Sequence, residues 1–260
     1  VTLQGLGQLD EAVKSYEQAI VIKPDYAEAH NNLGNAFQEL GQREDATKSY
    51  EKALALQPDN AEAHNNLGKA FQELGQREDA AKSYEKALAV NPDYAEAHNN
   101  LGNAFQDLGQ VEAAVKCYEK ALSLISDNAN TYNNLGIAYM QLDQLDAAIK
   151  CYKKALDIKP DYADANYNLG NVFKELDQLD IAIKCYEKAL AIKPDYADAH
   201  YNLGITLEGL GQLDEALACY DRAVVLKPDI NFILGVLLHT KMHLCIWDDL
   251  PNRLNELTKK

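Results

Sequence analysis

Asparagine recurs every 34 residues at one position of this 260-residue chain. Its side-chain amide carries a donor and an acceptor, so it can pair with the N–H and the C=O of an extended peptide, whatever the peptide's sequence. Asparagine is also a mediocre helix former, because its side chain competes for backbone hydrogen bonds. Six identical choices therefore indicate a requirement. The six residues, called the asparagine ladder below, are Asn32, Asn66, Asn100, Asn134, Asn168 and Asn202.

Two roles for the ladder fit this spacing. In the first, the amides hold the backbone of a bound peptide. In the second, each amide bonds to the neighbouring repeat and fixes how the repeats stack. Alanine is a better helix former than asparagine, so the first role predicts that replacing ladder asparagines by alanine leaves the helices intact and weakens peptide binding. The second role predicts a less stable chain, and the period alone leaves both open.

Histidines are the next candidate ligands. His239 and His243 lie four residues apart, a spacing that places two imidazoles on one helix face and suits zinc. A third ligand and the glutamate of the metalloprotease motif are missing, so we expect no metal site. The other four share one repeat position and are interpreted as packing residues near a helix start: His30, His64, His98 and His200.

The cysteines are interpreted as small residues on a helix face. Cys117, Cys151, Cys185 and Cys219 recur every 34 residues, where earlier repeats have serine. The sequence has no CxxC pair, which fits a reducing compartment, and we expect a cytoplasmic protein. It also has no glycine-rich phosphate loop and no nucleophile elbow, so we predict no catalytic residue and no cofactor for this chain.

The same 34-residue step defines the elements that position the ladder. In residues 27–60 the first half places Leu33 and Phe37 on one apolar helical stripe, and Gly41 follows where a left-handed C-cap is expected. The second half repeats the stripe with Tyr50, and Pro58 prevents its continuation. Each unit is thus predicted to be a helix–turn–helix, and the units must stack to bury their stripes.

Two local details of the unit carry further expectations. Asp59, three residues before Glu62, is predicted to cap the first helix of the following unit. Gly34 lies inside a predicted helix, where glycine costs about 1 kcal/mol relative to alanine. We expect it to allow close approach of the partner helix, with Ala46 as the matching small residue and Tyr50 filling the remaining space.

The pattern of Leu33-Gly34, Phe37, Ala46, Tyr50, Ala53 and Pro58 resembles the tetratricopeptide repeat. Six complete units follow one another: 27–60, 61–94, 95–128, 129–162, 163–196 and 197–230. Residues 1–26 resemble the second helix of an earlier unit, so we expect a piece of a longer protein. The resemblance implies an all-α right-handed superhelix of thirteen repeat helices whose first helices line a concave groove. Residues 231–260 are predicted to add one or two capping helices at a junction to a further domain.

Charge narrows the class of partner. The chain has 25 basic and 40 acidic residues, a net charge of −15. Such a surface repels phosphate backbones and anionic lipid, which argues against nucleic acid or a membrane as the partner. We therefore predict proteins or extended peptides as partners, and the sequence leaves homo-oligomerisation open.

The tail carries a second resemblance. Cys245, Trp247, Asp249, Arg253 and Leu257 form the spacing C-x-W-x-D-x₃-R-x₃-L, which is similar to the junction between repeats and catalytic region in O-linked N-acetylglucosamine transferases. In that family the resemblance implies an asparagine ladder that grips protein substrates, and a sugar-nucleotide site in domains that would follow the tail. The same residues are also compatible with an amphipathic helix that caps the last repeat.

The resulting prediction is the substrate- or partner-recognition arm of such a transferase, without catalytic activity of its own. The alternative is a stand-alone scaffold that assembles other proteins. A co-chaperone that clamps the terminal carboxylate of a chaperone needs lysine and arginine in the groove. The corresponding positions hold Glu28, Glu62 and Glu96, which would repel an acidic terminus.

Overall fold

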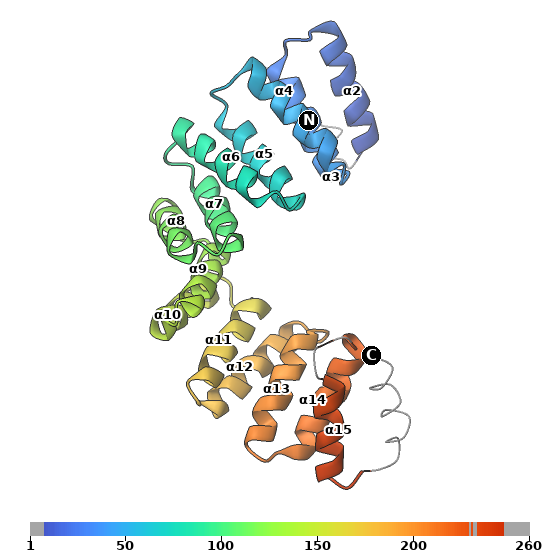
Figure 1. The fold of residues 1–260 in the computed structure, drawn as a ribbon, viewed down its shortest axis with the longest axis vertical. Coiled ribbons are helices and arrows are strands. Elements are labelled where there is room, and N and C mark those ends of the chain that lie inside the picture. Colours follow the sequence, from blue (N-terminus) through green and yellow to red (C-terminus); the bar gives the residue numbers. More distant parts are fainter. Residues whose placement is uncertain (1–7, 229, 231–232, 247–260) are drawn as a thin grey trace. The chain divides into compact units, whose positions relative to one another are not determined.

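The computed structural model describes residues 8–228, 230 and 233–246, and in this part of the chain every regular element is a helix (Figure 1). Thirteen of these helices are the predicted repeat helices and the last is a tail helix, which confirms the all-α prediction. The bounds are α2 (Leu9–Ile22), α3 (Ala27–Glu39), α4 (Arg43–Leu56), α5 (Ala61–Glu73), α6 (Arg77–Val90), α7 (Ala95–Asp107), α8 (Val111–Leu124), α9 (Ala129–Gln141), α10 (Leu145–Ile158), α11 (Ala163–Glu175), α12 (Leu179–Ile192), α13 (Ala197–Gly209), α14 (Leu213–Leu226) and α15 (Ile233–His243).

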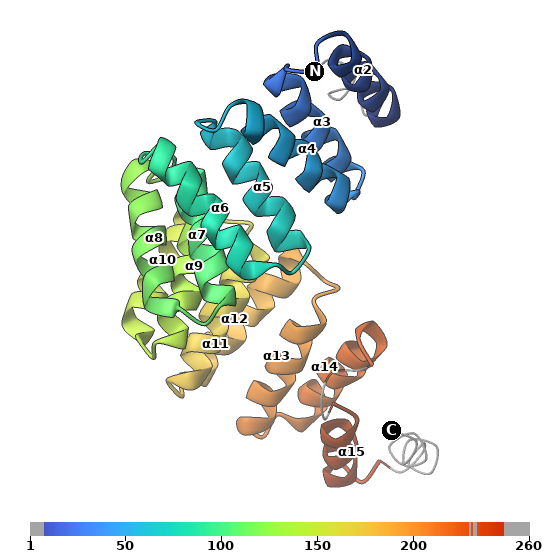
Figure 2. The same cartoon turned by 45° about the horizontal axis from the view of Figure 1, so that its top comes forward.

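The chain forms two compact units, Val1–Ala138 and Tyr139–Lys260, and their boundary falls within α9. In the first unit α3 packs on α4, α5 on α6 and α7 on α8, and these hairpins stack through α4–α5 and α6–α7 (Figure 2). In the second unit α11 packs on α12 and α13 on α14, the two hairpins meet through α12–α13, and α15 covers α14. Within each unit, helices therefore pack mainly on their neighbours in sequence, as a stacked array requires.

The glycine inside each first helix accommodates an aromatic ring. A Cβ atom built at Gly34 would lie 2.6 Å from Cε1 of Tyr50, a distance that real Cβ atoms do not show. Tyr50 is completely buried, and the equivalents Gly68, Gly102, Gly170 and Gly204 face their own tyrosines at 2.5–2.7 Å. The glycine is thus required by the ring itself, a more direct contact than the space-filling role expected for Tyr50.

The turn between the two helices of a repeat needs a left-handed residue. Gly41 has φ +74°, as predicted, and nothing lies near its missing side chain. In two later repeats Asp143 and Asp177 take the same position with φ near +57°. Aspartate tolerates this conformation better than most residues with a side chain, so the turn is kept without glycine.

The predicted cap at Asp59 is wrong. Helix α5 begins at Ala61, so the residue directly before it is Asn60, whose side chain accepts a hydrogen bond from the backbone N–H of Ala63 at 3.0 Å. Asp59 lies one residue too early, in the turn after Pro58. The helix boundary, rather than the residue type, decides which side chain caps.

The tail contributes one helix to the described chain. On α15, Ile233 and Leu237 are buried, and the cluster of Ile233 and Leu234 contacts Ala223 of α14. Of the segment 231–260 that is predicted to cap the repeats, residues 231–232 and 247–260 lie outside the described residues, and so does the part of the junction motif beyond Cys245. None of the described helices combines the length and apolar character needed to cross a membrane.

Candidate functional site: the asparagine ladder

The structure places all six ladder residues on the first helices of their repeats, each about half-buried. Four of them donate a hydrogen bond from Nδ2 to the Oδ1 atom of an asparagine in the preceding repeat, at 3.0–3.1 Å. The pairs are Asn66 to Asn35, Asn100 to Asn65, Asn134 to Asn103 and Asn202 to Asn171. These bonds tie one repeat to the next, which is the geometry expected for the stacking role.

Three of the accepting asparagines also bind the buried tyrosine of their own repeat. The Tyr50 hydroxyl donates to Asn35 Oδ1 at 2.7 Å, the same oxygen that accepts from Asn66. The arrangement recurs as Tyr118 to Asn103 and Tyr186 to Asn171, both at 2.8 Å. Each set of tyrosine, asparagine and ladder asparagine is called a Tyr–Asn–Asn bridge below. Each bridge joins both helices of one repeat to the first helix of the next.

The bridges alternate along the chain because the accepting position alternates. It holds Asn35, Asn103 and Asn171 in the first, third and fifth complete repeats, and Lys69, Ile137 and Ile205 in the others. Where Lys69 replaces the acceptor, Asn100 donates instead to Asn65, four residues earlier on α5. The sequence shows this alternation, but its meaning depends on a contact between residues 31 positions apart, which no helical period indicates.

The ladder keeps hydrogen-bonding capacity in the first unit. An asparagine amide has two N–H donors and an oxygen with two lone pairs, and the stacking bond uses one donor. Among the described residues, the structure shows no partner for Oδ1 of Asn66 or Asn134. Asn202 differs, because its Nδ2 also donates to the Tyr167 hydroxyl at 2.9 Å and its Oδ1 accepts from Lys174 Nζ at 3.2 Å. Burial lowers the pKa of Lys174.

A groove of about 460 Å³ lies beside the ladder, between α3 and α5. Its amides are Asn35, Gln38 and the ladder residue Asn66. Its charged residues are Lys69 and three glutamates: Glu39, Glu62 and Glu73. Lys69 pairs with Glu96, and Arg43 pairs with Glu73 at 3.0 Å. Carboxylates outnumber the lysine on these walls, so the groove favours ligands that bring hydrogen-bond donors and positive charge.

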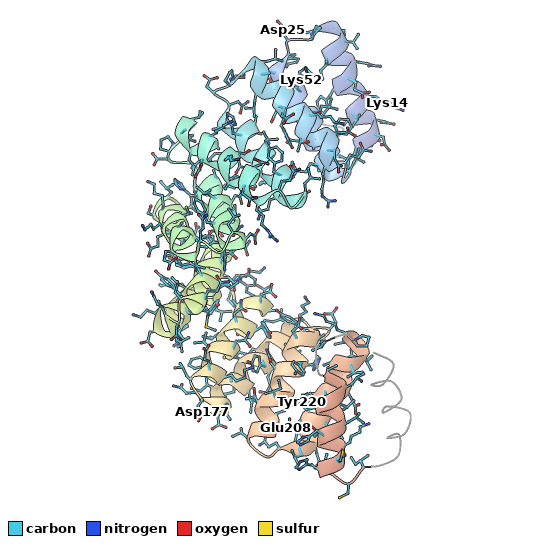
Figure 3. All side chains as sticks on the ribbon, in the orientation of Figure 1. Lys14, Asp25, Lys52, Asp177, Glu208 and Tyr220 are labelled. Carbon is cyan, nitrogen blue, oxygen red and sulfur yellow. The ribbon has the colours of Figure 1, made fainter. Side chains whose placement is uncertain are left out.

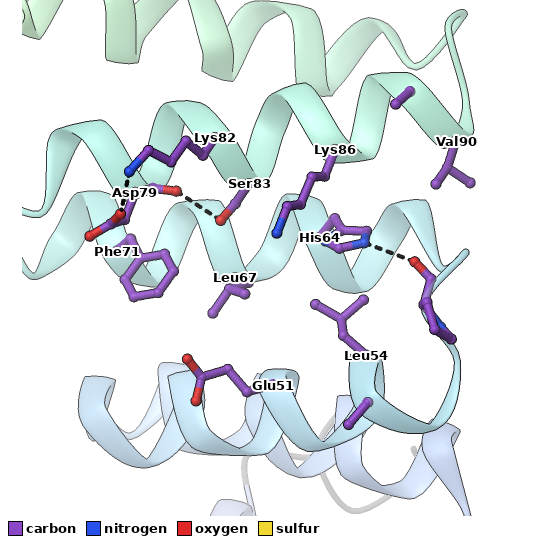
Figure 4. A pocket seen from close by; sticks show the side chains of 13 residues that line it. Glu51, Leu54, His64, Leu67, Phe71, Asp79, Lys82, Ser83, Lys86 and Val90 are labelled. Carbon is purple, nitrogen blue, oxygen red and sulfur yellow. Dashed lines mark hydrogen bonds and ion pairs between the residues drawn. The ribbon is translucent and has the colours of Figure 1, made fainter.

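A larger cavity, of about 710 Å³, lies among α4, α5 and α6 (Figure 4). Leu54, Leu67 and Phe71 line it. Several of its polar groups have partners: Lys82 pairs with Asp79 at 3.2 Å, and His64 Nε2 lies 2.9 Å from the Pro58 carbonyl (Figure 4). Within the part of the chain that the structure describes, Nδ1 of His64 is buried without a hydrogen-bond partner, and none of the ladder residues lines this cavity.

The histidines and cysteines of the repeats pack as predicted. His30, His64, His98 and His200 each place Nε2 2.9–3.2 Å from the carbonyl of the proline six residues earlier. Cys151 and Cys185 are buried free thiols. Burial raises the pKa of Cys117 and of Cys219 to about 11, which keeps them protonated and poorly nucleophilic.

Solved structures resemble the chain over most of its length. The crystal structure of MamA is 31% identical, with a TM-score of 0.58, and the match covers 62% of this chain and 95% of MamA. YrrB, described as a TPR protein with an unusual peptide-binding site, is 24% identical over 73% of this chain and 98% of its own, with a TM-score of 0.59. PilF of Pseudomonas aeruginosa is 20% identical, with a TM-score of 0.71, and the match covers 89% of this chain and 99% of PilF. The last two likenesses show the fold alone, and no curated protein matches the chain.

Family models match the chain nearly end to end. The TPR repeat model matches residues 6–41, 35–75, 73–109, 102–143, 138–177 and 170–211, and the tetratricopeptide repeat model matches residues 197–230. Together these matches span the partial repeat and all six complete units. The chain belongs to the tetratricopeptide repeat family.

Proposed function

We propose that the chain is a protein-binding scaffold whose first unit holds an extended peptide segment along Asn66, Asn100 and Asn134. The observation that carries this proposal is the hydrogen-bonding state of the ladder. Stacking engages Nδ2, and Asn66 and Asn134 keep an oxygen that can accept from the backbone N–H of a peptide. The two roles considered for the ladder are then compatible, because different atoms of the same amide serve them.

The repeat spacing suggests the form of the bound segment. Packed helices lie about 8–10 Å apart. A polyproline II chain rises about 3.1 Å per residue with three residues per turn, or about 9 Å per turn. A peptide in this conformation would present an equivalent backbone N–H to each successive ladder residue, so we expect about three peptide residues per repeat.

The groove beside Asn66 suggests the class of partner. Its walls carry Glu39, Glu62 and Glu73 against one lysine, and the whole chain carries −15. Peptides rich in lysine or arginine should bind more tightly than acidic peptides of equal length, and salt should reduce the difference. YrrB is a precedent for peptide binding on this fold, although its similarity to this chain supports the fold alone.

The test uses nine-residue peptides, the length that three ladder residues would contact. Titration of a fluorescent basic peptide should give measurable affinity, and a scrambled peptide of the same composition should bind about equally. N-methylation of every third amide should weaken binding about tenfold to a thousandfold, since three lost hydrogen bonds contribute about 0.5–1.5 kcal/mol each. Equal affinity of the methylated peptide would contradict backbone recognition.

Matched variants separate binding from stacking. Asn66→Ala and Asn134→Ala should weaken peptide binding. Tyr186→Phe removes a stacking hydroxyl from the bridge that ends on Asn202, outside the proposed peptide contacts, and it should lower stability but not affinity. Asn202→Ala is the second control, because Tyr167, Lys174 and the preceding repeat already occupy this amide. Loss of affinity only in proportion to loss of stability would overturn the binding role.

The finer form of the proposal is that this scaffold is the substrate- or partner-recognition arm of an O-linked N-acetylglucosamine transferase-like protein. It is supported by the ladder together with the spacing from Cys245 to Leu257. The chain alone, incubated with a sugar nucleotide and an acceptor protein, should transfer no sugar, and turnover would refute its non-catalytic role. A glycosyltransferase-like region encoded after Lys260 would support the finer proposal. A stop codon there would support the alternative, a stand-alone assembly scaffold.

A further inference from the structure

Two histidines on α15 form a constellation that the peptide-binding proposal does not use. His239 and His243 lie one helical turn apart, and their Nε2 atoms are 3.2 Å from each other. Their ring centroids are 4.4 Å apart. Both residues are exposed, so an ion can approach from solvent. We propose that His239 and His243 form an open Zn²⁺ site, in which water or a group of a bound partner supplies the remaining ligands.

The spacing of the two nitrogens fits this ion. Zinc binds imidazole nitrogen at about 2.0–2.1 Å and prefers tetrahedral geometry. Two nitrogens 3.2 Å apart at that bond length enclose an angle of about 103° at the metal, close to the tetrahedral value. In the metal-free pair, the two Nε2 atoms are close enough for an Nε2–H of one ring to donate to Nε2 of the other. When zinc binds, the ring that held this proton carries it on Nδ1 instead, so both Nε2 lone pairs face the ion.

A carboxylate lies near the other ring nitrogen of His239. Glu208 of α13 places Oε1 3.5 Å from Nδ1 of His239. Its Oε2 accepts a hydrogen bond from the Tyr220 hydroxyl at 2.7 Å, and Figure 3 labels these two residues. Tyr220 is fully buried in the second unit, so its hydrogen bond restrains the Glu208 carboxylate. A proton on Nδ1 that faces this carboxylate leaves Nε2 as the metal-binding atom.

This site was not expected from the sequence, because two histidines alone lack a third ligand. Within the described residues no group of three or more ligating side chains forms, so the proposed site is a two-histidine chelate. The sequence does not indicate the role of Glu208, which lies 31 residues before His239. It reaches His239 because α13 and α15 both pack on α14. Glu208 is a positioning residue rather than a ligand.

The experiment is calorimetric titration of the full, untagged, EDTA-treated chain with zinc chloride. We expect one saturable site. His239→Gln and His243→Gln should each weaken it at least tenfold, and circular dichroism should be unchanged because both side chains are exposed. Glu208→Gln should weaken it about tenfold at unchanged stoichiometry, the usual effect of removing a carboxylate behind a ligating histidine. Unchanged zinc affinity in either glutamine variant of the histidines would overturn the proposal.

Three matched variants test the geometry. Lys241→His combined with His243→Gln keeps two histidines but places them two residues apart, on different faces of the helix, and should not bind. His98→Gln removes a histidine of the repeat position and should leave binding unchanged. Cys245→Ser should also leave it unchanged. Retained binding in the relocated pair, or its loss in either of the other two variants, would overturn the two-histidine site.

Discussion

Asn103→Ala tests whether the Tyr–Asn–Asn bridges hold the repeats together. The substitution removes the acceptor of two hydrogen bonds, one from Tyr118 at 2.8 Å and one from Asn134 at 3.0 Å. At about 0.5–1.5 kcal/mol each, the loss is about 1–3 kcal/mol. Alanine returns up to ~0.7 kcal/mol as the better helix former, and Gln106 remains 2.9 Å from the hydroxyl, so the net loss should be about 0.5–2.5 kcal/mol.

The assay is urea unfolding followed by circular dichroism, arranged as a double-mutant cycle. Asn103→Ala, Asn134→Ala and the double variant should give a coupling energy of about 0.5–1.5 kcal/mol, since the two residues share one bond. Lys69→Ala is the matched control: it occupies the same repeat position, but the Tyr84 hydroxyl donates to Gln72 instead. The reasoning is refuted if Asn103→Ala costs no more than Lys69→Ala, or if the coupling is near zero.

Three further predictions concern the interior of the repeats. Gly102→Ala should destabilise the array, although alanine is the better helix former, because the new Cβ would lie 2.5 Å from the Tyr118 ring. Gly109→Asn, at φ +73°, should be tolerated, and the melting temperatures of the two variants test this difference. Iodoacetamide followed by mass spectrometry should label the exposed Cys245 well before Cys117, whose burial raises its pKa to about 11, and equal rates would contradict the packing of Cys117. Burial also raises the pKa of six repeat tyrosines above 10.0: Tyr50, Tyr84, Tyr118, Tyr152, Tyr186 and Tyr220. As pH rises, these hydroxyls therefore lose their protons in the unfolded chain before they do so in the folded chain. Their contribution to stability is complete below about pH 10 and is lost above it, and Tyr118→Phe should flatten the fall of melting temperature between pH 9 and 11.

The periodic part of the fold was predictable from the residues. Pro58 and Gly41 bracket α4, and the structure ends the helices where these residues indicate. The glycine in each first helix indicated a close contact, although the partner proved to be the ring of Tyr50. These features succeed because they are local: a left-handed turn or an interrupted helix is decided by a few adjacent residues.

The atoms that the ladder uses were not predictable in the same way. Whether Asn66 bonds to a ligand or to Asn35 depends on side-chain direction and on the register between two helices of different repeats. That register is set by the packing of Tyr50 and its equivalents, which lies outside any single helical pattern. The departure of Asn202 from the other ladder residues likewise arises from Tyr167 and Lys174, two substitutions that look unremarkable in the sequence.

The alternation of the bridges has a consequence for how the first unit opens. The junction between residues 27–60 and 61–94 is fastened by the Tyr50–Asn35–Asn66 bridge, with Arg43 paired to Glu73 beside it. The junction between 61–94 and 95–128 has no such bridge. It is crossed by the bond from Asn100 to Asn65, a contact between Gln72 and Asp107, and two exposed ion pairs, Lys69–Glu96 and Lys120–Asp93, which stabilise little. Thermal fluctuations should therefore part the chain first between α6 and α7. The backbone amides at the α6–α7 junction should therefore exchange with deuterium earlier than those at the α4–α5 junction. The array would then open in blocks of two repeats rather than one repeat at a time.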